Sequence, residues 1–152
     1  REARLIATTP LGPETAHGTF FAPRAWELQS LSQLQRENFG PALHLVRWKA
    51  DQLDAVIEAI NNTGDGLTLG IHSRIDETVE KIAARARVGN VYVNRNQIGA
   101  VVGVQPFGGQ RLSGTGPKAG GSHYLPRVTT EKTVTINTTA AGGNASLLTL
   151  GE

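Results

Sequence analysis

The side chains that most often carry out covalent chemistry in enzymes are missing from this chain of 152 residues or lack the neighbours that such chemistry needs. There is no Cys, which excludes disulfides, thiolate metal sites and a cysteine nucleophile within the chain. No Ser lies in the Gly-x-Ser-x-Gly turn that presents the nucleophile of many hydrolases. We therefore predict no catalytic residue in this chain and look instead for residues that bind.

Metal and phosphate sites are not predicted either. The four histidines are isolated in the sequence and lack the spacing of metal ligands: His17, His44, His72 and His123. Residues 114–119 have the spacing G-x-G-x-x-A of a dinucleotide-binding turn, but no buried strand leads into them and Pro117 interrupts the helix that should follow. We interpret this segment as an ordinary turn.

Composition and charge narrow the class of protein. The formal net charge of +2 comes from residues scattered along the chain, without a block of Lys or Arg, so a nucleic-acid partner is not expected. No apolar run approaches the roughly 20 residues of a membrane helix. The 18 glycines and 39% hydrophobic residues favour a loop-rich α/β protein. The absence of Met and of a signal segment at the start indicates a piece of a longer chain.

Strands and helices alternate in the middle of the chain. Residues 42–48 alternate as a strand, and the helix after them carries the apolar stripe Leu53, Val56, Ile57 and Ile60. Residues 67–71 predict the next strand, and the helix opened by Asp76 carries a second stripe before Gly89: Val79, Ile82, Ala83 and Ala86. A third strand follows at residues 91–93. This order predicts an α/β fold, with a parallel sheet covered by helices.

The remaining segments are predicted to be loops, apart from one strand. The Gly-rich residues 94–121 leave the carboxyl end of the third strand, the edge where open α/β sheets bind ligands. Residues 128–136 alternate as an exposed strand. Residues 1–19 are predicted to be an irregular entry into the domain, and residues 138–152 a small, polar tail.

Two of the loop segments carry motifs of a known family. Glu37-Asn38-Phe39-Gly40-Pro41 resembles the Glu-x-Phe-Gly-Pro motif of the aldehyde dehydrogenase superfamily. The letters PFGG at 106–109, followed by Ser-Gly at 113–114, resemble its Pro-Phe-Gly-Gly…Ser-Gly motif. The order and spacing of the two motifs match those of the family. GDGLTLGIHSR and VGNVYVNR, which lie between them, also look like strands of that family.

A finer resemblance concerns one branch of the superfamily. Residues 98–107 (IGAVVGVQPF) and 120–125 (GGSHYL) look like the 1-pyrroline-5-carboxylate dehydrogenases, which oxidise L-glutamate γ-semialdehyde to L-glutamate in proline catabolism. Residues 137–146 resemble the bifunctional proline utilisation A proteins, in which a proline dehydrogenase domain precedes the aldehyde dehydrogenase. The resemblance implies that residues 1–127 belong to the catalytic domain and that residues 128–152 form an oligomerisation strand and tail.

The resemblance also implies roles for five residues. Glu37 would accept hydrogen bonds from the ribose hydroxyls on the nicotinamide side of NAD, and Phe39 would lie against the nicotinamide region. Gly99 and Ala100 would bind the substrate's α-carboxylate through backbone N–H groups, because small side chains let a backbone approach an anion. Phe107 would form an aromatic wall beside the substrate's aliphatic chain. Without the motifs, Glu37 would be a solvated carboxylate, the Gly99–Ala100 pair a flexible loop and Phe107 a core aromatic.

In the family, a Cys attacks the aldehyde before hydride passes to NAD, and that Cys would lie outside this chain, so we expect the isolated chain to be inactive. The resemblance further implies a cytoplasmic enzyme with a small-molecule substrate and no metal. FAD would bind only in a separate proline dehydrogenase domain, and the enzyme would form a homo-oligomer through its C-terminal strand. The alternative is a non-catalytic oligomerisation or scaffold module, or a pseudoenzyme, because an exposed strand such as residues 128–136 seeks a partner edge.

Overall fold

A three-stranded sheet forms the first part of the molecule. The computed structural model describes residues 3–137. Its first sheet contains β1 (Arg4–Thr8), β2 (Arg24–Leu28) and β3 (Ala42–Val46), in that spatial order. β2 pairs antiparallel with β1 and parallel with β3. Along β3 the residues alternate between half-buried and exposed, which confirms the strand predicted from the apolar alternation of this segment.

The prediction of an irregular entry over residues 1–19 was wrong, because this stretch contains β1. All five residues of β1 are exposed, so the strand has no apolar alternation that would reveal it in the sequence. The turn residues that dominate the stretch lie in the connection to β2, which includes the short 3₁₀ helix η1 (Pro13–His17). A strand of mixed polarity was therefore hidden beside a conspicuous turn.

The second part of the molecule is an α-β-α-β unit. Its elements are α1 (Leu53–Asn62), β4 (Thr68–Ile71), α2 (Asp76–Arg85) and β5 (Asn90–Val93). β4 and β5 pair in parallel, and both predicted helices are confirmed. The apolar stripe of α1 faces inward: Ile57 is only 1% exposed, and Ile71 and Tyr92 from the two strands are also buried.

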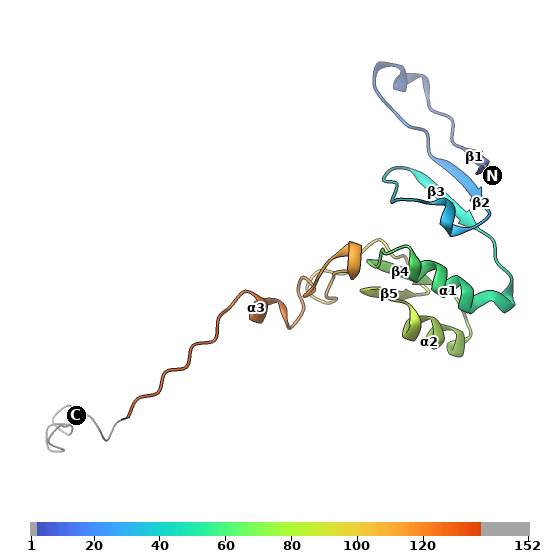
Figure 1. Cartoon of the computed structure of the whole chain (residues 1–152). Helices are drawn as coiled ribbons and strands as arrows, with labels where there is room; N and C mark the ends of the chain where they lie inside the picture. Colours follow the sequence, from blue (N-terminus) through green and yellow to red (C-terminus); the bar gives the residue numbers. More distant parts are fainter. Residues whose placement is uncertain (1–2, 138–152) are drawn as a thin grey trace, which may run out of the picture.

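The α/β class is confirmed, but the strands divide between two sheets instead of forming one (Figure 1). β3 lies beside β2 in the first sheet, while β4 and β5 form the second. Alternating strands and helices indicate parallel pairing, but they do not say which strands are neighbours. Because β2 was not recognised in the sequence, β3 had no visible partner other than β4.

Two side chains of α1, those of Asn61 and Asp54, help to join α1 to α2. The Asn61 amide nitrogen donates to the Arg85 carbonyl oxygen at 3.0 Å, and its amide oxygen accepts from the backbone N–H of Arg87 at 2.8 Å. Asn61 is 4% exposed, so these bonds satisfy a buried polar group. At the surface, the carboxylate of Asp54 on α1 pairs with Lys81 at 2.7 Å and with Arg85 at 2.6 Å.

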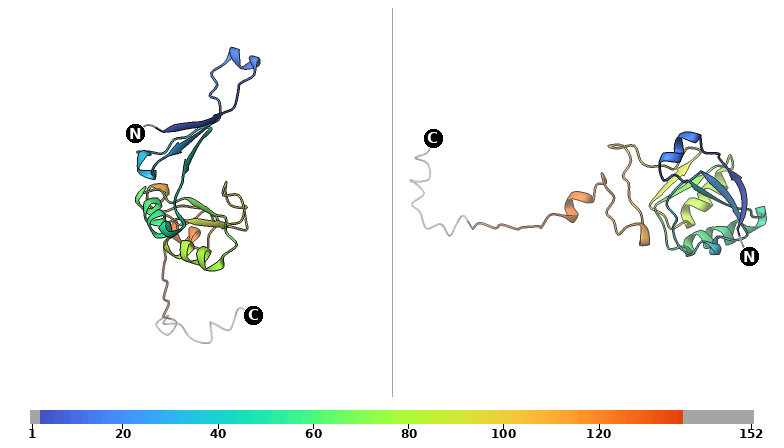
Figure 2. Two further views of the ribbon diagram at one scale, coloured as in Figure 1. Left: turned by 90° about the vertical axis from the view of Figure 1, so that its right-hand side faces the viewer. Right: turned by 90° about the horizontal axis from the view of Figure 1, so that it is seen from above.

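The chain after β5 forms a long loop and then leaves the two sheets. Its regular pieces are η4 (Arg111–Ser113), a bridge between Phe107 and Ala119, and α3 (Tyr124–Arg127). Beyond α3, the exposed residues 128–137 extend away from the rest of the molecule in all views (Figures 1 and 2). No described strand pairs with residues 128–136, and a strand needs such a partner for its hydrogen bonds, so the oligomerisation strand and the domain boundary before it stay predictions. The predicted tail at 138–152 lies outside the described residues.

Within residues 3–137, no helix is long and apolar enough to cross a membrane.

Replacing Asn61 with Ala is expected to lower the free energy of unfolding by about 1–3 kcal/mol, because the Arg85 carbonyl and the Arg87 N–H lose their partner in these part-buried hydrogen bonds. Urea unfolding followed by circular dichroism measures this change. The matched control is Asn62→Ala, the same substitution at the exposed neighbouring position, which should change the free energy by no more than about 0.5 kcal/mol. Equal destabilisation by the two substitutions would show that the two hydrogen bonds of the Asn61 side chain do not stabilise the fold.

The Glu27 carboxylate lies between Arg4 and Arg47 and should make the protein sensitive to acid. The hydrogen bond from Arg4, and after it the one from Arg47, lowers the pKa of the Glu27 carboxyl from its ordinary value of 4.5. A lowered folded-state pKa contributes stability that is present above the unfolded-state pKa and is lost as the pH falls through the folded-state value. Glu27→Gln should therefore lose less stability than the wild type between about pH 7 and about pH 3.

Urea midpoints at the two pH values measure the difference between these proteins. Glu131→Gln, at an exposed position, serves as the control and should keep the pH dependence of the wild type. Identical pH dependence in Glu27→Gln and the wild type would show that this carboxyl contributes nothing to acid sensitivity.

Candidate functional site

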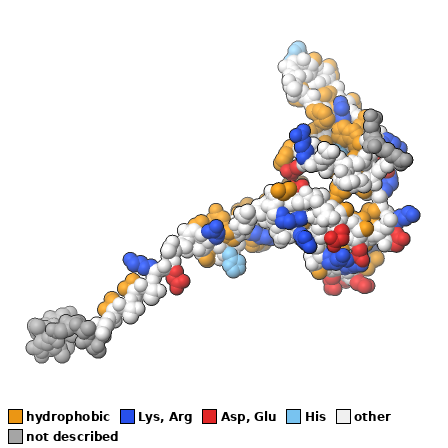
Figure 3. Space-filling model, viewed as in Figure 1, with side chains coloured by type: hydrophobic (Ala, Val, Ile, Leu, Met, Phe, Trp, Pro, Cys, Tyr) orange, Lys and Arg blue, Asp and Glu red, His pale blue; other side chains and the backbone are white. Residues whose placement is uncertain are grey.

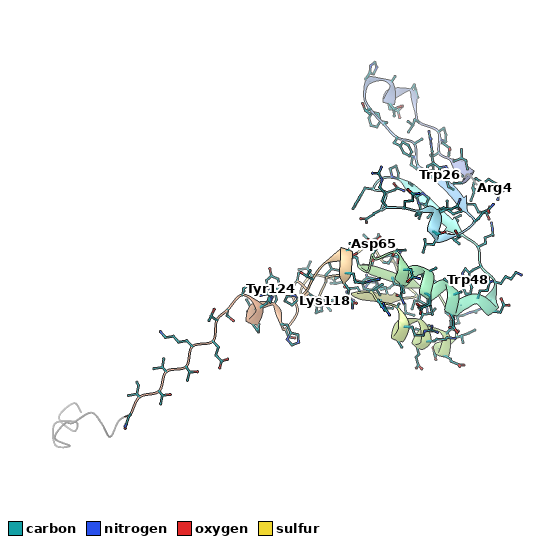
Figure 4. All side chains as sticks on the ribbon, viewed as in Figure 1. Arg4, Trp26, Trp48, Asp65, Lys118 and Tyr124 are labelled. Carbon is teal, nitrogen blue, oxygen red and sulfur yellow. The ribbon has the colours of Figure 1, made fainter. Side chains whose placement is uncertain are left out.

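A large apolar hollow lies against β2 and β3. Its volume is about 840 Å³. The side chains that line it are mainly apolar or aromatic and include Phe21, Trp26, Leu28, Leu34, Phe39 and His44. Trp26 and His44 face each other across the two strands, with stacked rings whose centroids are 5.8 Å apart. Figure 4 shows Trp26 on this sheet. The hollow could hold one face of a flat organic group.

Phe39 lines this hollow and Glu37 lies two residues before it, in the loop that leads into β3. Phe39 is 89% exposed, which is unusual for an aromatic side chain. Glu37 is exposed too and lines a neighbouring cavity of about 270 Å³, which shares Asn38 and His44 with the first. The structure thus brings Glu37 and Phe39 to adjacent hollows.

The local backbone sets the direction of this loop. Gly40 has φ +133°, a conformation that side-chain-bearing residues rarely adopt, and its carbonyl accepts from the N–H of Ala42 at 2.8 Å. The carbonyl of Pro41 accepts from the N–H of Arg24 at 3.0 Å, which ties the motif to the start of β2. Gly40 and Pro41 therefore turn the chain from the exposed residues 37–39 into β3.

Gly99 and Ala100 lie in the loop that follows β5. Both are half-buried, while the side chains around them are highly exposed: Ile98 by 89% and Val102 by 96%. A Cβ placed on Gly99 would meet no atom within 4 Å, so the space beside this backbone is open. The N–H groups of Gly99 and Ala100 find no acceptor among residues 3–137. Two free backbone donors beside open space suit an anion.

Phe107 is half-buried and its backbone is held from both sides. Its N–H donates to the Ala119 carbonyl at 3.0 Å and its carbonyl accepts from the Ala119 N–H at 2.9 Å. The buried Asn90 side chain brackets it, because its amide nitrogen donates to the Pro106 carbonyl at 2.9 Å and its amide oxygen accepts from the Gly108 N–H at 3.3 Å. These bonds thus hold the backbone that carries the Phe107 ring.

The predicted site residues form two groups. Glu37 and Phe39 lie on the three-stranded sheet, and Gly99, Ala100 and Phe107 lie in the loops after β5, with no described cavity lined by members of both groups. Asp65, labelled in Figure 4, lies in the turn after α1 and lines the same cavity as Glu37.

Sequence reasoning missed two residues that hold these loops, Asn90 and Arg95. Asn90 is a polar residue at the first position of a buried strand, 8% exposed, and this contrast with its neighbours was the available signal. Arg95 is the only charged residue from position 95 to position 110. Among the described residues no group of three or more His, Cys, Asp or Glu could hold a metal ion.

Comparison with known proteins gives the family. The model of the aldehyde dehydrogenase family matches residues 2–134. The bifunctional protein PutA of Rhizobium meliloti is 55% identical over 84% of this chain, and that of Escherichia coli K12 is 60% identical over 76% of it. The 1-pyrroline-5-carboxylate dehydrogenase of Geobacillus sp. is 47% identical over 60% of the chain. The aligned part is 10%, 9% and 18% of these relatives' own lengths.

Solved structures agree with this family. Proline utilization A from Bradyrhizobium japonicum is 60% identical, with a TM-score of 0.85 over 92% of this chain and 14% of that one. A 1-pyrroline-5-carboxylate dehydrogenase from Thermus with bound NAD is 39% identical, with a TM-score of 0.71 over 82% of this chain and 24% of that one. The resemblance predicted from the two motifs is confirmed: this chain belongs to the aldehyde dehydrogenase family.

Proposed function

We propose that this chain forms one wall of the cofactor site and one wall of the substrate site in an NAD-dependent dehydrogenase that oxidises L-glutamate γ-semialdehyde to L-glutamate. The observation that carries the proposal is the pair of free N–H groups at Gly99 and Ala100, beside open space in the loop after β5. Such a pair suits the α-carboxylate of this aldehyde. The PutA and 1-pyrroline-5-carboxylate dehydrogenase names of the relatives support the same substrate.

Glu37 and Phe39 fit the nicotinamide end of NAD. An exposed carboxylate with two acceptor oxygens can accept hydrogen bonds from both ribose hydroxyls. The exposed ring of Phe39, at the rim of an apolar hollow of about 840 Å³, can lie against a flat ring. NAD, when bound, takes up the hydride that leaves the substrate. Phe107, with its backbone held by Ala119 and Asn90, would limit the movement of the substrate's aliphatic chain.

The chemistry of covalent catalysis has to come from residues outside this chain, since the sequence has no Cys. We further propose that the enzyme is cytoplasmic and that, in a bifunctional protein, FAD binds only to a separate proline dehydrogenase domain. Copies of the enzyme would assemble through residues 128–136. That segment also supports the second candidate, a non-catalytic oligomerisation or scaffold module, because it is exposed along its whole length and pairs with no described strand.

Glu37→Ala in the intact enzyme is expected to raise the KM for NAD about 10-fold or more, because hydrogen bonds to a charged acceptor are lost. The KM for the aldehyde at saturating NAD should change much less. Steady-state kinetics and calorimetric titration with NAD measure both effects. The control Glu77→Ala removes an exposed carboxylate from the first turn of α2 and should leave the KM for NAD as it is. An unaltered NAD affinity in Glu37→Ala would remove Glu37 from the cofactor site.

The isolated chain is expected to show no turnover of glutamate semialdehyde with NAD, because it contains no thiol to attack the aldehyde. The measurement is the absorbance of NADH in a preparation shown by mass spectrometry to be free of any longer protein. The intact enzyme, assayed in parallel, is the positive control. NADH formation by the chain alone would contradict the assignment of the covalent step to residues outside it.

A further inference from the structure

The side chain of Arg95 donates hydrogen bonds only to residues of the loop that follows β5. Its Nε donates to the Asn96 carbonyl at 3.1 Å, Nη1 to the Gln105 side-chain oxygen at 3.2 Å, and Nη2 to the Gly99 carbonyl at 3.2 Å. The guanidinium also lies over the ring of Tyr92, 4.5 Å from its centroid. This half-buried side chain is therefore held in one place.

Gln105 completes the closure of the loop. Its side-chain oxygen accepts from the N–H of Val101 at 3.0 Å as well as from Arg95, and its own N–H donates to the Val101 carbonyl at 2.9 Å. Arg95 and Gln105 thus join the two ends of residues 95–105. Hydrogen bonds rather than apolar packing hold this loop, since Ile98 and Val102 at its surface are exposed.

The bond from Arg95 to Gly99 acts on the peptide group that offers the next N–H. The Gly99 carbonyl and the Ala100 N–H belong to one peptide group, and this peptide is trans. In a trans peptide the two groups point in opposite directions, so the N–H of Ala100 points away from Arg95. A cation that donates to the carbonyl polarises the peptide and strengthens its N–H as a donor. Arg95 therefore favours an anion on the far side of this peptide.

No other charge in the loop competes with that of Arg95. Residues 96–110 contain neither Lys nor Arg and neither Asp nor Glu. The next two cations along the chain are engaged elsewhere: Arg111 donates to the carbonyls of Asn61 and Asp65, and Lys118 donates to the carbonyl of Gly89.

We infer that Arg95 is a positioning residue that sets the preference of the enzyme for an aldehyde carrying a carboxylate over a neutral one. The inference rests on the proposed function, because it assumes that the anion at Gly99 and Ala100 is that of the substrate. Arg95 holds the carbonyl side of the Gly99–Ala100 peptide, and the substrate's carboxylate accepts from the opposite, N–H side. A neutral aldehyde of the same length gains nothing from this polarised donor.

The test compares 5-oxopentanoate, which is glutamate semialdehyde without its amino group and carries one negative charge, with pentanal, a neutral aldehyde of equal chain length, as substrates of the intact enzyme. In Arg95→Met, the ratio of kcat/KM for the anionic over the neutral aldehyde should fall about 10-fold or more, mainly through a higher KM for the anionic one. Arg95→Lys, which keeps the charge and loses the planar fork, should recover part of that ratio. The control Arg74→Met removes the same charge from an exposed position and should keep the wild-type ratio.

A second variant keeps the inference testable if Arg95→Met does not fold. Gln105→Glu preserves the acceptor for Arg95 and Val101 but neutralises the guanidinium, so the ratio should fall in this variant too. A wild-type ratio in Arg95→Met, or in Gln105→Glu where only that variant folds, would overturn the inference. If the wild-type enzyme itself does not oxidise glutamate semialdehyde, the proposed function fails instead, and the two failures are therefore distinct.

Discussion

The backbone of Gly66 holds together three segments that lie far apart in the sequence. Its carbonyl accepts from the N–H of Gly89 at 2.9 Å and from that of Gln110 at 3.0 Å, and its N–H donates to the Ser113 hydroxyl at 2.9 Å. A Cβ at Gly66 would stand 2.5 Å from the Arg87 carbonyl oxygen, so only glycine permits this approach. The turn after α1, the start of β5 and the loop behind Phe107 consequently share one small junction.

This junction matters because the hydrophobic core of the described residues is small. Their buried hydrophobic residues are Ala22, Leu28, Ile57, Ile71 and Tyr92. Many large hydrophobic side chains are instead exposed, among them Phe39, Ile98 and Val102. Figure 3 shows hydrophobic side chains at the surface over the three-stranded sheet and along the segment that leads away from it. With so little apolar burial, hydrogen bonds between loops and strands decide where the site residues stand. Exposed apolar surface of this kind is typical of an interface, in keeping with relatives several times longer than this chain.

The sequence predicted those parts of the fold whose burial is periodic. Ile57 and its stripe revealed α1, and the alternation of residues 42–48 revealed β3. It did not reveal β1, which is exposed on both faces, or the division into two sheets, because pairing depends on strands that have no apolar signature. The motifs predicted roles for Glu37, Phe39 and Phe107 through their resemblance to a family, and these roles stay proposals. They did not locate Arg95 or Asn90, whose importance lies in contacts with backbone groups up to 18 positions away.

Three asparagines show how the loops are fixed without added charge. Asn61 brackets the backbone at Arg85 and Arg87, and Asn90 brackets Phe107 from positions 106 and 108. Asn94 binds both the N–H and the carbonyl of Ser73, at 3.0 and 2.9 Å. A carboxamide offers one donor group and one acceptor, as a peptide does, whereas an ionised Asp offers only acceptors. Aspartates in these positions would leave carbonyls without a donor, and at positions 90 and 94 they would put negative charge at the start and just past the end of the strand that leads into the loop of Gly99 and Ala100. Asn90 and Asn94 thus hold the segments on either side of Arg95 without adding charge to them, and Arg95 is the only charged residue from position 95 to position 110.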